Sequence, residues 1–146
     1  MKSIINRKAK HDYEILETYE AGIVLLGTEV KSIRSGGANL KDSYVDIEHG
    51  ELYIVNFHIS PYKFSNITFN HDPYRKKKLL LHKSQIRKLI GKIKEKGLTL
   101  VSLSVYAKYG KIKVEIALAK GKKLYDKRRS IKESDIKREQ ERSLKY

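Results

Sequence analysis

The chain has 146 residues, which suits one domain with a single core, and its lack of cysteine excludes a disulfide scaffold and a zinc site built on thiolates. Its 32 Lys and Arg against 17 Asp and Glu give a net charge of +15, which is typical of a protein with a polyanionic partner. The N-terminus carries charges where a signal peptide needs an apolar stretch, and no apolar run approaches the length of a membrane span, so we expect a cytoplasmic protein without a membrane partner.

The first third of the chain predicts strands and one short helix. DYEILETY and GIVLLG (residues 12–19 and 22–27) alternate apolar and polar residues, which predicts a hairpin with its turn in YEAG. The segment TEVKSIRSGG (residues 28–37) predicts a helix capped by Thr28, with Glu29 in its first turn and the two glycines at its end.

The next two elements are a hairpin and a helix. YVDIEHGELYIVNF (residues 44–57) predicts a hairpin around His49-Gly50, in which Val45 and Ile47 pair with Leu52 and Ile54. The segment SQIRKLIGKIKEK (residues 84–96) spaces its apolar residues as one stripe of a helix, with Ser84 as N-cap and Gly97 as the stop.

The last hairpin is the most regular of the chain. LTLVSLSVYAKYG and KIKVEIALA (residues 98–110 and 111–119) alternate strictly around Tyr109-Gly110. In the first strand Val101, Leu103, Val105 and Ala107 are predicted to share the core face. Several short antiparallel strands at this spacing indicate a mainly β fold, a small barrel or sandwich, with flanking helices.

The C-terminal segment, residues 121–146, is basic and nearly devoid of apolar residues. Ser130 and Glu133 have the spacing of a capping box, and two Glu–Lys pairs follow at i, i+4. Each pair contributes only about 0.2–0.5 kcal/mol, less than a helix of this length needs to form by itself. We therefore expect a tail, separate from a body at residues 1–120, that becomes helical only on a partner.

The positive charge belongs to the second half of the chain. Residues 1–73 have a net charge of −2 and residues 74–146 a net charge of +17. Lys and Arg at phosphates release counterions and give affinity with little sequence preference, so nucleic acid is the predicted partner. A basic surface kept for solubility, or a helix lying on a membrane, are the alternatives. The first predicts an even spread of charge, which this chain does not have, and the second needs an apolar helix face of Trp, Phe and Leu, which the tail lacks.

Four basic groups are predicted phosphate donors: NRKAK (residues 6–10), RKKK (75–78), the polar face of the 84–96 helix, and Lys111 with Lys113. Four aromatic residues are predicted to be exposed and able to stack on unpaired bases: Tyr62, Phe64, Phe69 and Tyr106. This combination is typical of OB-fold proteins that bind RNA.

Catalytic motifs are weak by comparison. The five histidines lack metal-ligand spacing, and we predict no metal and no cofactor. Glu29 and Lys31 have the E-x-K spacing of Mg²⁺-dependent nucleases, for which Asp12 is the available third residue. A carboxylate at a helix start is also explained by the helix dipole, so we expect a binding protein rather than an enzyme.

Four blocks of the sequence, in a match that runs from about Asn6 to the C-terminus, are similar to those of a known family: NRKAKHDYEILETYEAGIVLLGTEVKSIRSGGANLKDSYV, HISPY, NHDPYRKKKLLLHKSQIRKLIGKIKEKGLTLVSL and ALAKGKKLYDKRRSIKE. In these blocks the chain resembles the SmpB family, the SsrA-binding proteins that partner tmRNA. The resemblance implies an antiparallel OB-like β-barrel with flanking helices, and a basic tail that becomes helical on the ribosome.

The resemblance also implies a function in trans-translation. Family members bind the tRNA-like domain of tmRNA, replace its missing anticodon arm, and accompany alanyl-tmRNA into ribosomes stalled on truncated mRNA. The body then lies at the decoding centre among rRNA, and the tail enters the empty mRNA channel. Elongation factor Tu and alanyl-tRNA synthetase are partners through tmRNA. A ribosomal or assembly protein that binds rRNA permanently is the alternative.

Site residues follow from the matching blocks. The tmRNA-facing set implied by the resemblance is Asn6, Arg7, Lys8, Glu20, Lys31, Leu80, His82 and Lys113. The ribosome-facing set at the base of the tail is Gly121, Lys122, Lys123, Tyr125, Asp126, Lys127 and Arg128. Glu20, an acid on an RNA face, is expected to accept hydrogen bonds from bases or 2′-hydroxyls or to position a neighbouring cation.

Overall fold

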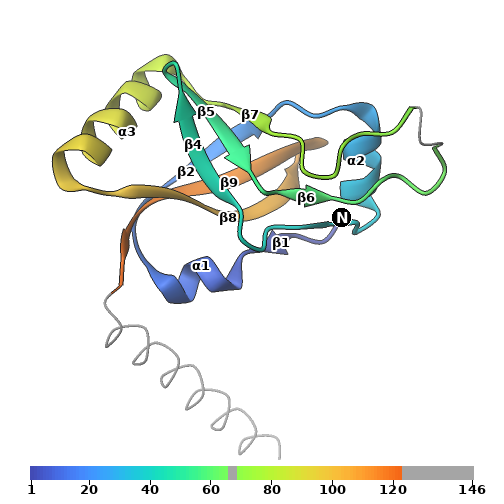
Figure 1. The fold of residues 1–146 in the computed structure, drawn as a ribbon, viewed down its shortest axis with the longest axis horizontal. Coiled ribbons are helices and arrows are strands. Elements are labelled where there is room, and N and C mark those ends of the chain that lie inside the picture. Colours follow the sequence, from blue (N-terminus) through green and yellow to red (C-terminus); the bar gives the residue numbers. More distant parts are fainter. Residues whose placement is uncertain (66–68, 123–146) are drawn as a thin grey trace, which may run out of the picture.

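Antiparallel strands dominate the structure, a computed structural model that describes residues 1–65 and 69–122 (Figure 1). The strands are β1 (Ile4–Ile5), β2 (Tyr13–Ile23), β3 (Ala38–Asn39), β4 (Tyr44–Glu48), β5 (Glu51–Val55), β6 (His58–Ile59), β7 (Lys77–Leu80), β8 (Thr99–Lys108) and β9 (Lys111–Gly121). The helices are α1 (Arg7–Asp12), α2 (Gly27–Arg34) and α3 (Lys83–Lys96). The predicted mainly β, antiparallel fold with flanking helices is confirmed.

Seven strands form one sheet in the order β1-β8-β9-β2-β7-β5-β4, and β3 pairs with β6 in a small second sheet. Within the described residues β4 and β1 end the large sheet without pairing with each other. The sheet nevertheless curves on itself, since the Ser43 hydroxyl before β4 lies 2.6 Å from the Ser102 hydroxyl on β8. The result is an open barrel whose inner face holds the main hydrophobic core.

Two of the predicted hairpins are confirmed. In β4–β5, Val45 faces Ile54 and Ile47 faces Leu52. His49 and Gly50 at its turn both have positive φ, as do Tyr109 and Gly110 at the β8–β9 turn. Two consecutive positive φ values match the right-handed twist of the strands and favour a glycine at the second position.

The strict alternation predicted for β8 is wrong, because the register shifts between Ser102 and Ser104. Val105 lies in the main core, whereas Val101 and Leu103 pack with Ala9 of α1 in a second cluster. A β-bulge moves the residues that follow it to the opposite face. It thereby allows one strand to supply apolar residues to the core and to the helix outside the sheet.

The predicted hairpin at residues 12–27 is also wrong, since β2 is a single eleven-residue strand and Glu20 lies within it rather than in a turn. Strand β9 pairs with β2 from Tyr13 to Gly22, which satisfies its backbone without a reversal. Gly22 allows close packing of β2 against β7 instead of a turn. A Cβ at Gly22 would lie 3.3 Å from Leu80 Cβ, on the next strand.

The helix starts differ from those predicted. Leu26, not Thr28, is the N-cap of α2, and His82, not Ser84, is the N-cap of α3. In both helices a side chain three residues on accepts from the N-cap amide: Glu29 Oε1 at 2.7 Å and Gln85 Oε1 at 3.3 Å. The stop of α3 is confirmed, because Gly97 has φ 62°.

Helix α1 was not predicted. It has only six residues, too few for a helical period to show in the sequence. The Asn6 side chain caps it by accepting from the Ala9 amide at 3.2 Å. The predicted helix from Ser130 lies outside the described residues.

Candidate nucleic-acid interface

Four strands place a row of residues on the outer face of the large sheet, the face turned away from the main core. Tyr106 of β8 pairs with Lys113 of β9, Lys113 with Gly22 of β2, and Gly22 with Leu80 of β7. Residues directly opposite in antiparallel strands share a face. Because Gly22 has no side chain, the Leu80 side chain can lie directly against it, and Leu80 stays 49% exposed.

Glu20 lies two residues before Gly22 and therefore on the same face. Its carboxylate accepts a hydrogen bond from the Tyr106 hydroxyl at 2.7 Å and another from Lys108 Nζ at 3.2 Å. These two donors, the tyrosine first, hold the pKa of Glu20 below its usual value. Burial and the neighbouring Glu20 raise the pKa of Tyr106 to about 12, so the phenol keeps its proton at neutral pH.

The outer face therefore combines different chemistries at close quarters. Lys113 supplies a cation, Glu20 an ionised acceptor in a fixed position, and Leu80 an apolar contact. A purely basic face binds phosphates without selection, whereas an acceptor beside an apolar group can also contact base edges, sugars and 2′-hydroxyls. The row with Glu20 is called the outer-face row below.

Helix α1 covers the other end of the same face. Ala9 packs against Ala117 and Ala119 of β9, which lie on the same side of that strand as Lys113. Asn6 is buried, and its amide donates to the Ser102 carbonyl at 2.9 Å, so this predicted contact residue holds α1 in place. Arg7 is exposed, and exposed Lys8 forms an ion pair with Asp42 at 3.0 Å.

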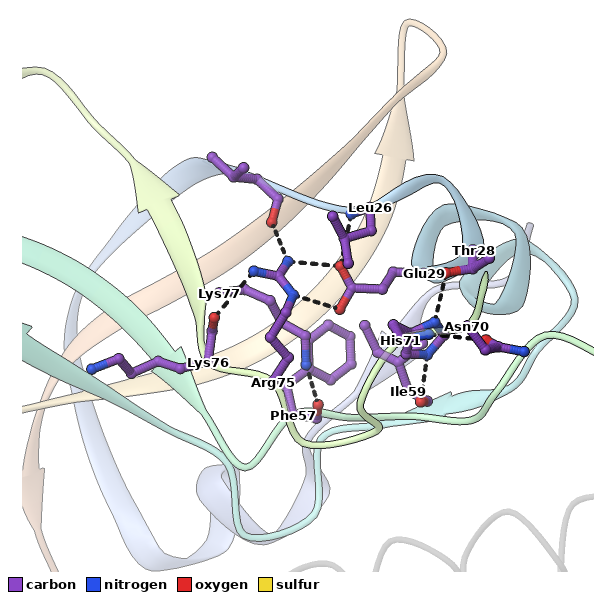
Figure 2. Close-up of polar contacts among 11 residues, drawn as sticks. Leu26, Thr28, Glu29, Phe57, Ile59, Asn70, His71, Arg75, Lys76 and Lys77 are labelled. Carbon is purple, nitrogen blue, oxygen red and sulfur yellow. Dashed lines mark hydrogen bonds and ion pairs between the residues drawn. The ribbon is translucent and has the colours of Figure 1, made fainter. Parts of the chain in front are cut away.

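Helix α2 carries Lys31 and is locked by a buried ion pair (Figure 2). The Glu29 side chain is 0% exposed, and its Oε1 accepts from Arg75 Nη2 and from the Leu26 amide, each at 2.7 Å. Arg75 Nε reaches Oε2 at 3.2 Å, and Nη2 also donates to the Val24 carbonyl at 3.0 Å. The carboxylate thus joins the start of α2 to the segment before β7.

This geometry contradicts the nuclease hypothesis. Both Glu29 oxygens already accept hydrogen bonds inside the protein, so the carboxylate is committed to Arg75 rather than to a metal ion. Within residues 1–65 and 69–122 no group of three or more metal-ligating side chains comes together. Capping of α2 and the ion pair with Arg75 account for the glutamate of the E-x-K pattern.

His71 fastens the loop after β6 to the same helix (Figure 2). Its Nε2 lies 2.8 Å from the Ile59 carbonyl, so Nε2 donates, and its Nδ1 lies 2.9 Å from the Thr28 hydroxyl. Asn70 accepts from the Tyr62 amide and donates to the Tyr62 carbonyl, both at 3.0 Å. This loop in turn presents the Tyr62 ring 5.6 Å from Lys31 Nζ.

The structure places the four cations of the predicted RKKK group in different surroundings. Arg75 binds Glu29, Lys76 binds Glu48, and Lys78 binds Glu51 at 3.0 Å. Lys77 is completely buried, and its Nζ donates to the Phe57 carbonyl at 2.6 Å. Burial lowers the pKa of Lys77 to about 8. Arg75 and Lys77 thus serve the fold, whereas Lys76 and Lys78 are held only by half-exposed ion pairs and stay predicted phosphate donors.

Two of the four predicted aromatic residues are well exposed: Phe64 at 85% and Phe69 at 73%. Tyr62 and Tyr106 are half-buried, and Tyr62 packs edge-on against Phe64 with ring centroids 5.5 Å apart. Stacking surface is thus available mainly on the loop after β6.

The remaining predicted residues divide into two groups. His82 is exposed at the start of α3, two residues after Leu80. Gly121 still belongs to β9, where it faces Tyr13, and the Lys122 amide donates to the Asp12 carbonyl at 3.0 Å. The other predicted tail residues, Lys123, Tyr125, Asp126, Lys127 and Arg128, lie outside the described residues.

Comparison with known proteins gives consistent matches along the chain. The family model "SmpB protein" matches residues 3–146. An SsrA-binding protein of Sulfurihydrogenibium sp. is 64% identical over 140 residues, 96% of this chain and 91% of the relative. One of Thermosynechococcus vestitus is 58% identical over 140 residues, covering 96% and 92%.

A solved structure is also similar. It is described as "tmRNA-SmpB: a journey to the center of the bacterial ribosome", and the matching chain has a TM-score of 0.68 and 54% sequence identity. The match covers 84% of this chain and 85% of that one. In the part of the chain that the structure describes, no helix is long and apolar enough to cross a membrane.

Proposed function

The chain belongs to the SmpB family, and we propose that it binds tmRNA and acts with it in trans-translation, the rescue of stalled ribosomes. The names of its relatives and the similar solved structure support this function over permanent binding to rRNA as a ribosomal or assembly protein. Membership of a family of RNA-binding proteins also supports a role in binding rather than in catalysis, and one that needs no cofactor.

The outer-face row is the observation that carries the proposal. Lys113, Glu20 and Leu80 come from three different strands, and the register brings them together on one exposed face. We assign the tRNA-like domain of tmRNA to this face. Lys113 would contact a phosphate, Leu80 would pack against a sugar or base, and Glu20 would accept from an amino group or a 2′-hydroxyl.

Helices α1 and α2 extend this surface. Arg7 and Lys8 would add phosphate contacts from α1, which Asn6 holds in place, and Lys31 would do so from α2. The ion pair between Lys8 and Asp42 is exposed on both sides, so water or phosphate can replace the carboxylate at little cost. His82 would contact the RNA where β7 leads into α3.

The tail provides the second half of the function. Residues 1–120 would form the body that binds tmRNA in place of an anticodon arm and that reaches the decoding centre. Residues 121–146 would enter the mRNA channel, with the set from Gly121 to Arg128 at its base. Elongation factor Tu and alanyl-tRNA synthetase would act through tmRNA, and all these partners place the protein in the cytoplasm.

Binding of the isolated tRNA-like domain, measured over a range of salt, tests the proposal. Lys113→Gln should weaken binding and lower the slope of log Kd against log salt by roughly 0.7–0.9, the value for one phosphate. Lys96→Gln, which removes the same charge at the end of α3, is the matched control and should leave the slope nearly unchanged.

The RNA that co-purifies with the full chain gives an independent answer. A tmRNA species supports the proposed function, and rRNA fragments alone would refute it in favour of a ribosomal or assembly protein. Equal slopes for wild type and Lys113→Gln would remove Lys113 from the interface.

A further inference from the structure

Gly91 lies in the middle of α3, on the side of the helix that is turned away from the core. The opposite side packs on the core through Leu89, Ile86 and Ile93. Glycine inside a helix is less favourable than alanine because it loses more backbone freedom on folding. A Cβ at Gly91 would meet nothing within 4 Å, and its φ is not positive. Neither packing nor backbone conformation in this chain therefore requires glycine here.

Charged residues surround this position. The helical neighbours of Gly91, three and four residues away on each side, are Arg87, Lys88, Lys94 and Glu95, and all four are exposed. Within residues 1–65 and 69–122 no carboxylate forms an ion pair with the three cations. Lys92, by contrast, binds Glu17 at 2.6 Å.

Together these observations favour a phosphate group as the ligand of this position. Arg87 and Lys94 are about 10 Å apart along the helix axis, so long side chains from both turns can reach a single group above Gly91. A group seated there meets bare helix backbone instead of a side chain. The three cations outweigh the single carboxylate of Glu95, so the net charge around Gly91 is complementary to a phosphate, and a linear polyanion would cross the helix at this point.

We propose that the Gly91 face, formed by Gly91 with Arg87, Lys88 and Lys94, binds the sugar-phosphate backbone of tmRNA. The inference rests on the proposed function and extends the interface beyond the residues assigned above. Helix α3 begins at Lys83, three residues after Leu80 of the outer-face row, so one RNA can follow both. The base of the tail lies beside α1, below α3 in the view of Figure 1, where the Lys122 amide donates to the Asp12 carbonyl.

Gly91→Ala separates this role from a structural one. In the absence of RNA the variant should be more stable, with Tm raised by about 2–4 °C, because alanine favours the helix. The added methyl group should nevertheless weaken binding to the tRNA-like domain at least about fivefold, since it fills space that the backbone of the RNA occupies. A substitution that stabilises the protein and weakens binding cannot act through the fold.

Charge variants provide the second measurement. Arg87→Gln and Lys94→Gln should each lower the salt slope by roughly 0.7–0.9, whereas Lys96→Gln, five residues from Gly91 and off its face, should leave it nearly unchanged. Equal effects of all three would indicate a diffuse basic field and overturn the proposed face.

The outcomes distinguish this inference from the proposed function. If wild type binds the tRNA-like domain but Gly91→Ala binds it equally well, the inference is wrong and the proposed function stands. The inference is also wrong if Gly91→Ala impairs only tagging on stalled ribosomes, because the face would then serve rRNA. If wild type itself fails to bind tmRNA, the proposed function fails.

Discussion

The ion pair between Glu29 and Arg75 is asymmetric, and the asymmetry predicts unequal effects of removing its two partners. Glu29 is 0% exposed, whereas Arg75 keeps 32% of its side chain in contact with solvent. Arg75→Met leaves a buried carboxylate with the Leu26 amide as its one remaining donor within residues 1–65 and 69–122, and it also deprives the Val24 carbonyl of a donor. Glu29→Gln leaves a cation that water can reach.

The expected magnitudes follow from burial. Removing one partner of a buried ion pair costs about 3–5 kcal/mol when the other charge stays buried, and we expect Arg75→Met in that range. Glu29→Gln keeps an oxygen for the Leu26 amide and loses one charge-assisted bond, so about 1.5–3 kcal/mol is expected. The double variant should be more stable than Arg75→Met alone, because the glutamine side chain introduced by Glu29→Gln carries no charge that would be left unpaired.

Urea unfolding of wild type, the two single variants and the double variant at neutral pH measures these differences in stability. Lys76→Met is the matched control, since Lys76 and Glu48 are about equally exposed and the loss of such a surface pair should change stability little. Additive losses in the double variant, or a larger loss for Glu29→Gln than for Arg75→Met, would refute the assignment of Glu29 as the buried partner.

Two further predictions concern the buried lysine and the tail. Burial lowers the pKa of Lys77 from 10.5 to about 8, so between these values the folded protein binds fewer protons than the unfolded chain and stability rises with pH. From pH 8 to 10 the unfolding free energy of wild type, relative to that of Lys77→Met, should therefore rise by up to about 1.4 kcal/mol per pH unit. If urea titrations give unfolding free energies that change with pH in parallel for the two proteins, this effect is excluded. Truncation after Gly121 should leave the affinity for the tRNA-like domain within a few-fold while abolishing peptide tagging on stalled ribosomes in a translation extract. Equal loss of both would contradict a separate role for the tail.

The parts of the fold that the sequence predicts correctly depend on local interactions. The β4–β5 and β8–β9 hairpins have their turns at His49-Gly50 and Tyr109-Gly110, where positive φ is needed, and alternation on both sides sets the register. Helix α3 ends at Gly97 for the same kind of reason. Each of these signals lies within a few residues of the structure that it determines.

The predictions fail where residues that are distant in the sequence determine the local structure. Gly22 looks like a turn residue in the sequence, but its role is to leave room for Leu80, 58 residues later. The bulge at Ser102 and Ser104 is invisible to a pattern of period two, because it exists to satisfy both the core and α1. The outer-face row likewise depends on three strand pairings, so its members are far apart in the sequence and carry no common motif.

The RKKK segment shows why a run of lysines is a poor guide to a binding surface. Successive residues in a strand point to opposite faces, so four consecutive cations cannot all face one ligand. In this chain Lys77 is buried inward, while Lys78 on the outer side meets Glu51. Cations that are spaced by the period of their element can act together: Arg87 and Lys94 follow the helical repeat on one side of α3. If the proposed Gly91 face binds RNA, the spacing of basic residues along their element, rather than their density in the sequence, identifies the phosphate contacts.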